Sequence, residues 1–380
     1  MASSTRTVGL SLLHLHNWSG TGFYAEQVLE ALRTSGSGEF RVVGLSSEGK
    51  TCSSDTGLDP EIRNIPAWRL RWPLRALSDW IGSSFGKGID ILHYPSGIGP
   101  PTRLRPIVLT LHDVSPFLYP QFFPNPRSIY LRMAITSLVR HASLILVDSL
   151  WQKERIEQVF PSSAARIRVL YPTCASVFRE SRQPSASIPY PEGDYFLCVG
   201  TLEPRKNLGL AIDAWRSHTQ VHSLVIVGRW GWMVEDLQQQ LASLGAYTKQ
   251  DHYDLWRLPD GREIRRYEFL PTDHLALLYR KALGLIYPSL FEGFGLPVLE
   301  AMVSGCPILT SRDSPMEEIA GPAGWYFDPR NSGSLNAALD DFLNNPAERK
   351  TRVEAGLGRQ KAFSPQTFKE GLLKAYREIP

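Results

Sequence analysis

The chain has 380 residues, enough for two domains with separate cores, and its 43% hydrophobic and 21% charged residues are typical of a soluble globular protein. Four well-separated cysteines, no signal-like N-terminus and no long apolar run argue against a disulfide framework, a zinc site and a membrane span, and predict a cytoplasmic setting. The net charge is only +3, but residues 1–190 contain 20 Lys and Arg against 14 Asp and Glu, so the first half is the better surface for an anionic partner.

The chain begins with a predicted strand, a glycine-containing loop and a helix. Apolar residues over 6–13 indicate the strand, and apolar side chains recur at helical spacing over 24–33. Between them, Gly20-x-Gly22-x-x-Ala25 matches the dinucleotide-binding pattern in its usual setting. The match by itself is weak, and it indicates only that a phosphate could lie at the N-terminus of this helix.

The next predicted strand, 40–45, overlaps a segment that satisfies the P-loop pattern, Gly44-x4-Gly49-Lys50-Thr51. A P-loop needs a helix that begins at its lysine, because the helix amides then surround the phosphate. The residues after Lys50 have the composition of turns and loops, so we reject this interpretation.

Residues 66–75 interleave aromatic and basic side chains. One interpretation is a surface, Trp68–Arg75, that docks on anionic lipid headgroups. The other is a solvated loop that leads into a helix, and the sequence leaves both interpretations open.

Two predicted strands, 89–95 and 106–113, each carry a histidine close to a loop, His93 in the first and His112 in the second. Ligands bind α/β sheets at the carboxyl ends of parallel strands, so His112 is a candidate site residue. The alternative, a histidine that caps a turn, is the stronger interpretation for His93. The elements predicted next are a helix over 127–140, a strand over 144–147, a helix that begins at 148–149 and a strand over 167–170.

Periodicity stops over 179–191, whose Ser- and Pro-rich composition predicts an interdomain linker. A second alternation then starts with a strand over 195–199, and its loop places Arg205 and Lys206 before a helix that extends to Trp215. The macrodipole disfavours cations at a helix N-terminus, so we expect an anion to join them. The alternative is a pair of solvated cations.

The segment 287–309 contains the strongest signal in the chain. An apolar strand precedes a turn that carries Glu292 and Gly295, and a helix over 298–304 contains Glu300. A carboxylate beside a helix N-terminus predicts an anion site, whereas the alternative is an ordinary β-α-β unit with solvated glutamates. The other elements predicted in this half are a strand over 224–227, a helix over 233–244, a less regular segment to 266, a helix over 273–281, a strand over 324–327 and helices over 332–344, 347–362 and 365–377.

Three motifs in the two halves of the chain carry a resemblance to one known family. They are Phe-Glu292-Gly-Phe-Gly-Leu-Pro-Val-Leu-Glu300-Ala-Met, Val-Gly-Thr-Leu-Glu-Pro-Arg205-Lys206-Asn-Leu and Leu-His112-Asp113-Val-Ser. With their surroundings they resemble the family-4 retaining glycosyltransferases of GT-B fold, over nearly the whole chain. Within this family the chain looks most like the bacterial mannosyl- and rhamnosyltransferases of surface polysaccharide synthesis.

The resemblance implies an α/β fold with two Rossmann-like domains that face each other across a cleft. It implies an acceptor-binding domain over 1–185 and a nucleotide-sugar-binding domain over 191–364. The C-terminal helix, 365–380, is expected to cross back and pack on the first domain.

The resemblance also assigns roles to the 287–309 segment. Glu292 would contact hydroxyls of the donor sugar, and Glu300 would hold the ribose hydroxyls. The backbone of Phe294, Gly295 and Leu296 would contact the sugar and the phosphate.

The remaining roles fall on the other two motifs and on the first glycine loop. Arg205 and Lys206 match the cations on the diphosphate, and Gly20 and Gly22 match the glycine loop that covers it. His112 matches the family histidine near the reacting sugar. Glu292, His112, Arg205 and Lys206 are therefore the expected catalytic residues.

Glycosyl transfer from a sugar nucleotide requires stabilisation of the departing diphosphate. The chain contains no Asp-x-Asp, the motif that holds a divalent ion in many transferases, so Arg205, Lys206 and helix N-termini are expected to replace the metal. We therefore expect no metal and no other cofactor. No second carboxylate is placed for a covalent double displacement. The resemblance implies front-face transfer with retention, in which the leaving phosphate takes the acceptor proton.

The expected co-substrate is a GDP- or UDP-linked sugar, with GDP-mannose as the first choice from the resemblance. The acceptor would be a glycan or a lipid-linked glycan, which is compatible with contact between Trp68–Arg75 and the inner face of the plasma membrane. No nucleic-acid partner is expected.

Three alternatives remain. A sugar-nucleotide epimerase or phosphorylase of GT-B fold would share the same motifs. An NAD-dependent oxidoreductase should have an acidic residue at the end of the second strand, but Glu39 precedes that strand and Glu48 follows it. A non-catalytic carbohydrate-binding module would not need cations and glutamates in both halves.

Overall fold

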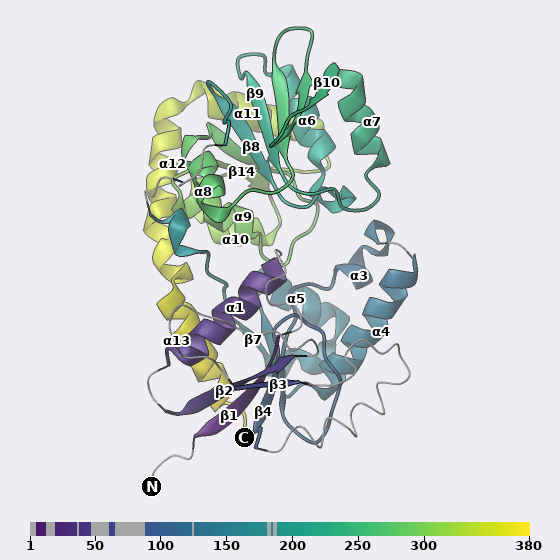
Figure 1. Ribbon diagram of the computed structural model, residues 1–380, viewed down its shortest axis with the longest axis vertical. Coiled ribbons are helices and arrows are strands. Elements are labelled where there is room, and N and C mark those ends of the chain that lie inside the picture. Colours follow the sequence, from purple (N-terminus) through teal and green to yellow (C-terminus); the bar gives the residue numbers. More distant parts are fainter. Residues whose placement is uncertain are drawn as a thin grey trace. The chain divides into compact units, whose positions relative to one another are not determined.

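The computed structural model describes residues 5–12, 20–35, 38–46, 61–64, 88–123, 125–180, 184 and 188–380. The chain divides into two compact units, the first comprising 1–173 with 363–380 and the second comprising 174–362. Each unit contains one sheet with helices packed against it (Figure 1).

The first unit is built on a parallel sheet of order β3-β2-β1-β4-β5-β6-β7. The chain adds strands on one side of β1 and then, from β4, on the other side, so the order reverses between these two strands. Such a switch point is where open α/β sheets bind ligands. The strands are β1 (Arg6–Ser11), β2 (Phe40–Ser46), β3 (Glu61–Asn64), β4 (Ile91–Tyr94), β5 (Ile107–Thr110), β6 (Leu144–Val147) and β7 (Ile167–Val169).

The helices of the first unit cover both faces of this sheet. Alternate strand residues point to opposite faces, so Val108 packs in a core with α1 and α13, whereas Ile107 and Leu109 pack in a core with α4 and α5. In Figure 1, α1 and α13 come from opposite ends of the chain and lie side by side, on the face of the sheet that contains Val108. The helices are α1 (Gly20–Arg33), α3 (Ser115–Leu118), α4 (Asn125–His141), α5 (Leu150–Val159) and α13 (Pro365–Arg377), with short 3₁₀ helices η1 (Pro120–Phe122) and η2 (Pro161–Arg166).

Helix α13 is attached to the first unit by polar as well as apolar contacts. The Arg377 guanidinium pairs with the Glu39 carboxylate at 2.7 Å, and the Tyr376 hydroxyl lies 2.6 Å from Nδ1 of His93. Leu372 is fully buried in the core beneath α1. The end of the chain is therefore an integral part of the first unit.

Helix α1 begins earlier than the sequence predicted. We expected a helix from Tyr24 after a glycine loop, but Gly20 and Gly22 lie in its first turn. Glycine has low helix propensity, but the buried side chains of Tyr24, Ala25 and Val28 fix the helix through packing and outweigh that cost.

The second unit has a sheet of order β10-β11-β12-β9-β8-β13-β14-β15, with its switch point between β8 and β13. The central strands are parallel, and β10 and β11 extend one edge as an antiparallel ribbon. The strands are β8 (Tyr195–Val199), β9 (Ser223–Val227), β10 (Ala246–Lys249), β11 (Asp254–Arg257), β12 (Glu263–Tyr267), β13 (Gly284–Tyr287), β14 (Ile308–Ser311) and β15 (Gly324–Phe327).

Helices of the second unit also pack on both faces of its sheet. Phe196 and Ile226 of the sheet form a core with Trp215 of α6 and Phe342 of α11. The helices are α6 (Leu208–Ser217), α7 (Glu235–Leu244), α8 (Thr272–Lys281), α9 (Leu296–Val303), α10 (Pro315–Ala320), α11 (Ser332–Asn344) and α12 (Pro346–Arg359), with single turns η3 (Ser176–Phe178), η4 (Pro204–Lys206), η5 (Gly321–Ala323) and η6 (Gln360–Phe363).

The edge ribbon corrects a second expectation. We expected a less regular segment up to Arg266, but this segment contains β10, β11 and most of β12. Charged side chains of β11 and β12 pair there, since Nε of Arg266 donates to Oδ2 of Asp254 at 2.9 Å while both side chains are buried. This pairing allows the charged side chains of β11 and β12 to be buried.

Candidate active site

The loop after β8 carries two of the predicted site residues. After Gly200 it forms the single turn η4, which contains Arg205 and Lys206, and α6 then begins at Leu208. Asn207 joins the two with left-handed backbone angles (φ 54°), and its Nδ2 donates to the Pro329 carbonyl at 2.8 Å. The cations therefore lie at the carboxyl edge of the sheet, beside the switch point.

The loop after β13 carries the other part of this site. Gly295 has φ 103°, and a Cβ atom there would lie 2.7 Å from Cγ of Met316, so only glycine fits without displacement. Helix α9 begins directly after it at Leu296, two residues earlier than the sequence predicted, with Pro297 in its first turn. Proline is compatible with this position because the first-turn amides have no intrahelical partner.

Glu292 joins the two loops. One carboxylate oxygen accepts from Nη1 of Arg205 at 2.6 Å, and the other accepts from Nζ of Lys206 at 2.6 Å. The Tyr287 hydroxyl accepts from Lys206 at 2.7 Å and donates to Glu292 at 2.9 Å. The structure thus brings together three predicted catalytic residues, and the Glu292 carboxylate lies between the two cations.

Two residues of this cluster were missed by the sequence analysis. Glu203 is buried and accepts from Nε of Arg205 at 2.9 Å, so two carboxylates balance the two cations. Tyr287 is the last residue of β13. Glu203 could have been predicted, because it lies two residues before Arg205 in the sequence. Tyr287 could not, because only folding places it against Lys206.

The charges of the cluster follow from its surroundings. Burial opposes ionisation of Glu292, but Arg205 and Lys206 outweigh it and lower the pKa of this carboxyl to about 2. Burial raises the pKa of Tyr287 well above its usual value, so its hydroxyl stays protonated. Burial also lowers the pKa of Lys206, although the Glu292 carboxylate opposes that shift.

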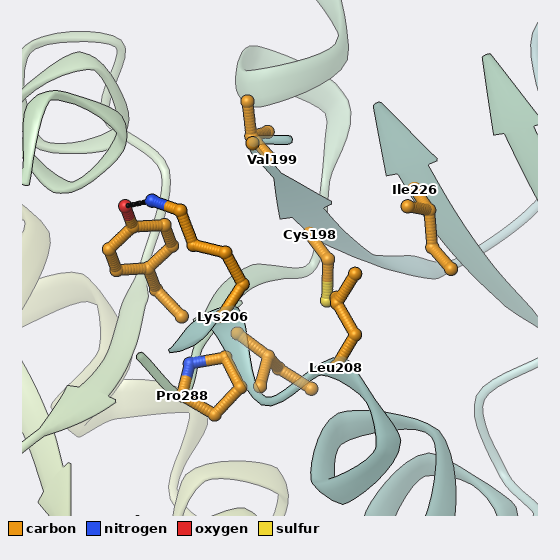
Figure 2. Close-up of a pocket in the computed structure, with 9 residues that line it drawn as sticks. Cys198, Val199, Lys206, Leu208, Ile226 and Pro288 are labelled. Carbon is orange, nitrogen blue, oxygen red and sulfur yellow. Dashed lines mark hydrogen bonds between the residues drawn. The ribbon is translucent and has the colours of Figure 1, made fainter. Parts of the chain in front are cut away.

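A small pocket adjoins this cluster at the carboxyl ends of β8, β9 and β13. Figure 2 shows that the aliphatic stem of Lys206 lines the pocket and that its amino group points away from Cys198 and Ile226. The pocket is lined by Cys198, Val199, Gly200, Lys206, Leu208, Ile226, Ile286, Tyr287 and Pro288. The buried stem holds the ammonium group in place beside Glu292.

Glu300 has a different environment from Glu292. Its Oε2 accepts from the Tyr279 hydroxyl at 2.9 Å, and burial raises the pKa of this carboxyl to about 7, which the tyrosine only partly offsets. Phe294, between the two glutamates, has a buried side chain. The two carboxylates of the motif therefore differ in charge at neutral pH.

In the first unit, His112 follows β5, and it lies close to two groups from neighbouring strands. Its Nδ1 is 2.7 Å from Oδ2 of Asp148, and its Nε2 is 2.8 Å from the Pro95 carbonyl oxygen. The His112 side chain keeps 19% of its surface exposed. Asp148 was not among the predicted site residues, although its place at the end of β6 was a signal.

His93 has the structural role that was the stronger interpretation of the sequence. It is fully buried, with Nδ1 near the Tyr376 hydroxyl and Nε2 3.0 Å from the Thr110 hydroxyl. Burial lowers the pKa of His93 to about 3, so the ring is neutral.

The expectations about a metal ion and about the membrane have less structural evidence. Within the described ranges, no group of three or more His, Cys, Asp or Glu side chains is arranged to hold a metal ion, and metal independence stays a prediction. No helix in the part of the chain that the structure describes is long and apolar enough to cross a bilayer. Trp68–Arg75 lies outside the described residues.

The environment of Glu300 generates a prediction about stability. A carboxyl whose folded-state pKa is raised stabilises the fold below its unfolded pKa, and this contribution is lost as pH rises through about 7. Glu300→Gln cannot ionise, so its free energy of unfolding relative to wild type should increase between about pH 4.5 and pH 7.5. Urea unfolding at both pH values measures this change. The control is Glu235→Gln, because Glu235 is exposed and its difference in free energy of unfolding from wild type should be the same at both pH values. If the difference for Glu300→Gln is also the same at both pH values, the prediction is wrong.

Two family models match the chain. The model described as glycosyl transferases group 1 matches residues 180–358, and the model described as glycosyltransferase family 4 matches residues 18–173. The matches divide close to the boundary between the two compact units.

Relatives and solved structures agree with these models. The chain is 30% identical over 326 residues to O-antigen chain mannosyltransferase B of Escherichia coli, covering 82% of this chain and 80% of that protein. It is 27% identical over 245 residues to an O-antigen chain mannosyltransferase of Salmonella typhimurium, covering 64% of this chain and 62% of that protein. The structure of Anabaena HepE in complex with UDP and glucose matches with a TM-score of 0.70 at 16% identity, over 98% of this chain and 99% of that chain.

The structural likeness confirms the expected GT-B architecture of two Rossmann-like domains, and the sequence likeness confirms the expected family. Neither comparison favours the epimerase, phosphorylase or oxidoreductase alternatives. This chain belongs to the family-4 glycosyltransferases and is a glycosyltransferase.

Proposed function

We propose that this glycosyltransferase moves mannose from a nucleoside diphosphate to a glycan or lipid-linked glycan during surface polysaccharide synthesis. The observation that carries the proposal is the cluster of Arg205, Lys206 and Glu292 beside the switch point of the second unit. Mannose is chosen because both relatives above are named O-antigen mannosyltransferases.

We propose that the domain expected over 191–364 binds the donor and that the domain expected over 1–185 binds the acceptor. Arg205 and Lys206 supply two positive charges that suit a diphosphate. A GDP- or UDP-linked sugar fits this site, and the HepE structure contains UDP and glucose. The backbone amides at the start of α9, from Phe294 to Leu296, would contact its phosphate and sugar.

Binding of a diphosphate has a consequence for Glu292. In the present structure its carboxylate lies between the two cations that the diphosphate would bind. The donor would therefore compete with Glu292, whose oxygens could then accept from hydroxyls of the transferred sugar. Glu300 is assigned to the ribose, and Gly20 and Gly22 are assigned to the diphosphate.

The proposed reaction requires no protein nucleophile. The bond between the anomeric carbon and the diphosphate oxygen breaks, and the acceptor oxygen forms a bond on the same face of the sugar. The acceptor proton passes to the departing phosphate oxygen, and Arg205 and Lys206 stabilise the negative charge that develops there. The cations take the part that a metal plays in other transferases, so the reaction is proposed to be metal-independent.

The enzyme is further proposed to work at the inner face of the plasma membrane, where a lipid-linked acceptor would be found. Trp68–Arg75 is the segment proposed to contact anionic lipids, since its arginines attract headgroups and its tryptophans favour the interface.

The first prediction from the proposed function concerns competition at the cations. Glu292→Gln keeps the size of the side chain but removes its charge, so turnover should fall about 100-fold. Affinity for the free nucleoside diphosphate should rise about tenfold, because no carboxylate then competes for Arg205 and Lys206. Calorimetry and steady-state kinetics measure the two effects. Unchanged turnover would remove Glu292 from the site.

The second prediction separates phosphate binding from base binding. Lys206→Ala should weaken binding of the nucleoside diphosphate by about 10- to 100-fold and leave binding of the nucleoside nearly unchanged. The control is Lys249→Ala, which removes an exposed lysine of β10 in the same unit. Equal losses for nucleotide and nucleoside would argue against a phosphate role.

The third prediction tests the reaction. Incubation with GDP-mannose and a glycan acceptor should give an α-linked product, because the α-linked donor reacts with retention. A β-linked product would contradict the proposed stereochemistry. Turnover of the donor without an acceptor would instead favour an epimerase.

The fourth prediction concerns the membrane. The protein should bind anionic vesicles at low salt and dissociate as salt is added, because counterions screen the arginines. The double change Arg69→Glu and Arg71→Glu should abolish binding without affecting nucleotide affinity. Absence of wild-type binding at low salt would exclude this contact.

A further inference from the structure

Both ring nitrogens of His112 face hydrogen-bond acceptors. Nε2 lies 2.8 Å from the carbonyl oxygen of Pro95, which can only accept, so this nitrogen must carry a proton. Nδ1 lies 2.7 Å from Oδ2 of Asp148. A neutral ring protonated on Nε2 would direct the lone pair of Nδ1 at this carboxylate, so a second proton must lie between them.

The burial of Asp148 supports the same proton count. The residue is only 4% exposed, and among the described residues His112 is the ionic partner of its carboxylate, whose Oδ1 has no hydrogen-bond partner. A buried carboxylate without a counter-charge is strongly unfavourable. An imidazolium at His112 provides that counter-charge.

We propose that Asp148 is a positioning residue that keeps His112 doubly protonated, so that His112 acts in glycosyl transfer through a fixed positive charge and not by moving a proton. The role of this charge in glycosyl transfer rests on the proposed function, whereas the protonation of His112 does not. Because both N–H groups are committed, the ring has no free site to accept a proton from the acceptor hydroxyl. Its charge instead suits the negative diphosphate as it departs.

The groups around His112 agree with a charged ring. Burial opposes the charge, but Asp148, the Pro95 carbonyl and, more weakly, Asp113 together raise the pKa of His112 above its ordinary value. Tyr24 of α1 packs against the imidazole at a ring-centroid distance of 5.0 Å, and burial raises the pKa of its phenol, so it adds no charge.

His93, in the same sheet, is an internal contrast. Its nitrogens face the hydroxyls of Tyr376 and Thr110, which can both donate and accept, so one proton on the ring is sufficient. The two histidines therefore differ in charge because their partners differ.

Nitrogen NMR of the imidazole groups tests the protonation directly, without donor or acceptor. In the wild type at pH 7.5, both nitrogens of His112 should have the shifts of a protonated imidazolium. In Asp148→Asn the ring should be neutral at this pH, with the proton on Nε2. The control is Asp90→Asn, whose carboxylate accepts from the Thr7 amide beside the opposite ends of the strands, and it should leave His112 protonated.

Kinetics test the role of the charge. Turnover of Asp148→Asn should fall about 100-fold at pH 7.5. It should recover towards wild type as pH falls to about 6, because the ring then regains its proton. In a His112→Gln background, Asp148→Asn should cost little more, since the two residues act as a unit.

Three results would overturn the inference: a neutral His112 in the wild type, a protonated His112 in folded Asp148→Asn, or an undiminished effect of Asp148→Asn in the His112→Gln background. Thermal unfolding of each variant identifies loss of fold, and if a variant does not fold, the protonation of His112 in the wild-type spectrum decides. Wild-type protein that transfers no sugar would contradict the proposed function and leave the protonation measurement valid.

Discussion

The buried ion cluster of Glu292 with Arg205 and Lys206 is the interaction on which the second unit's candidate site depends. Charges removed from water are tolerated only where opposite charges and hydrogen bonds compensate them. Here the loop after β8 supplies both cations and Glu203, and the loop after β13 supplies Glu292, so Lys206 and Glu292 have ionic partners only when the two loops meet. The cluster thereby fixes two loops at the switch point and keeps cations available at the edge of the sheet.

The same principle separates the carboxylates of this enzyme by their partners. Glu292 has two cations and remains ionised, whereas Glu300 has the Tyr279 hydroxyl and burial raises its pKa to about 7. Asp148 in the first unit is paired with His112. Charge pairing, rather than residue type, separates these acidic groups, and each unit has a paired carboxylate at the carboxyl edge of its sheet.

Much of the fold could be predicted from the sequence. Most strands have continuous apolar runs because the helices bury both faces of each sheet, and the helices that cover them have helical apolar spacing. The prediction was wrong where packing or pairing outweighed the local pattern. The first turn of α1 accommodates Gly20 and Gly22 because the following residues are buried. Asp254 of β11 and Arg266 of β12 are buried because they neutralise each other.

The family, the two-domain α/β class and the positions of the candidate residues could be predicted without a structure, because motifs and periodicity are local properties of the chain. Which charges pair with each other depends on folding. Arg205 and Glu292 are 87 residues apart, and His112 and Asp148 are 36 apart. Their contacts exist because parallel strands bring distant loops to one edge of a sheet, and no local pattern specifies the protonation state that results.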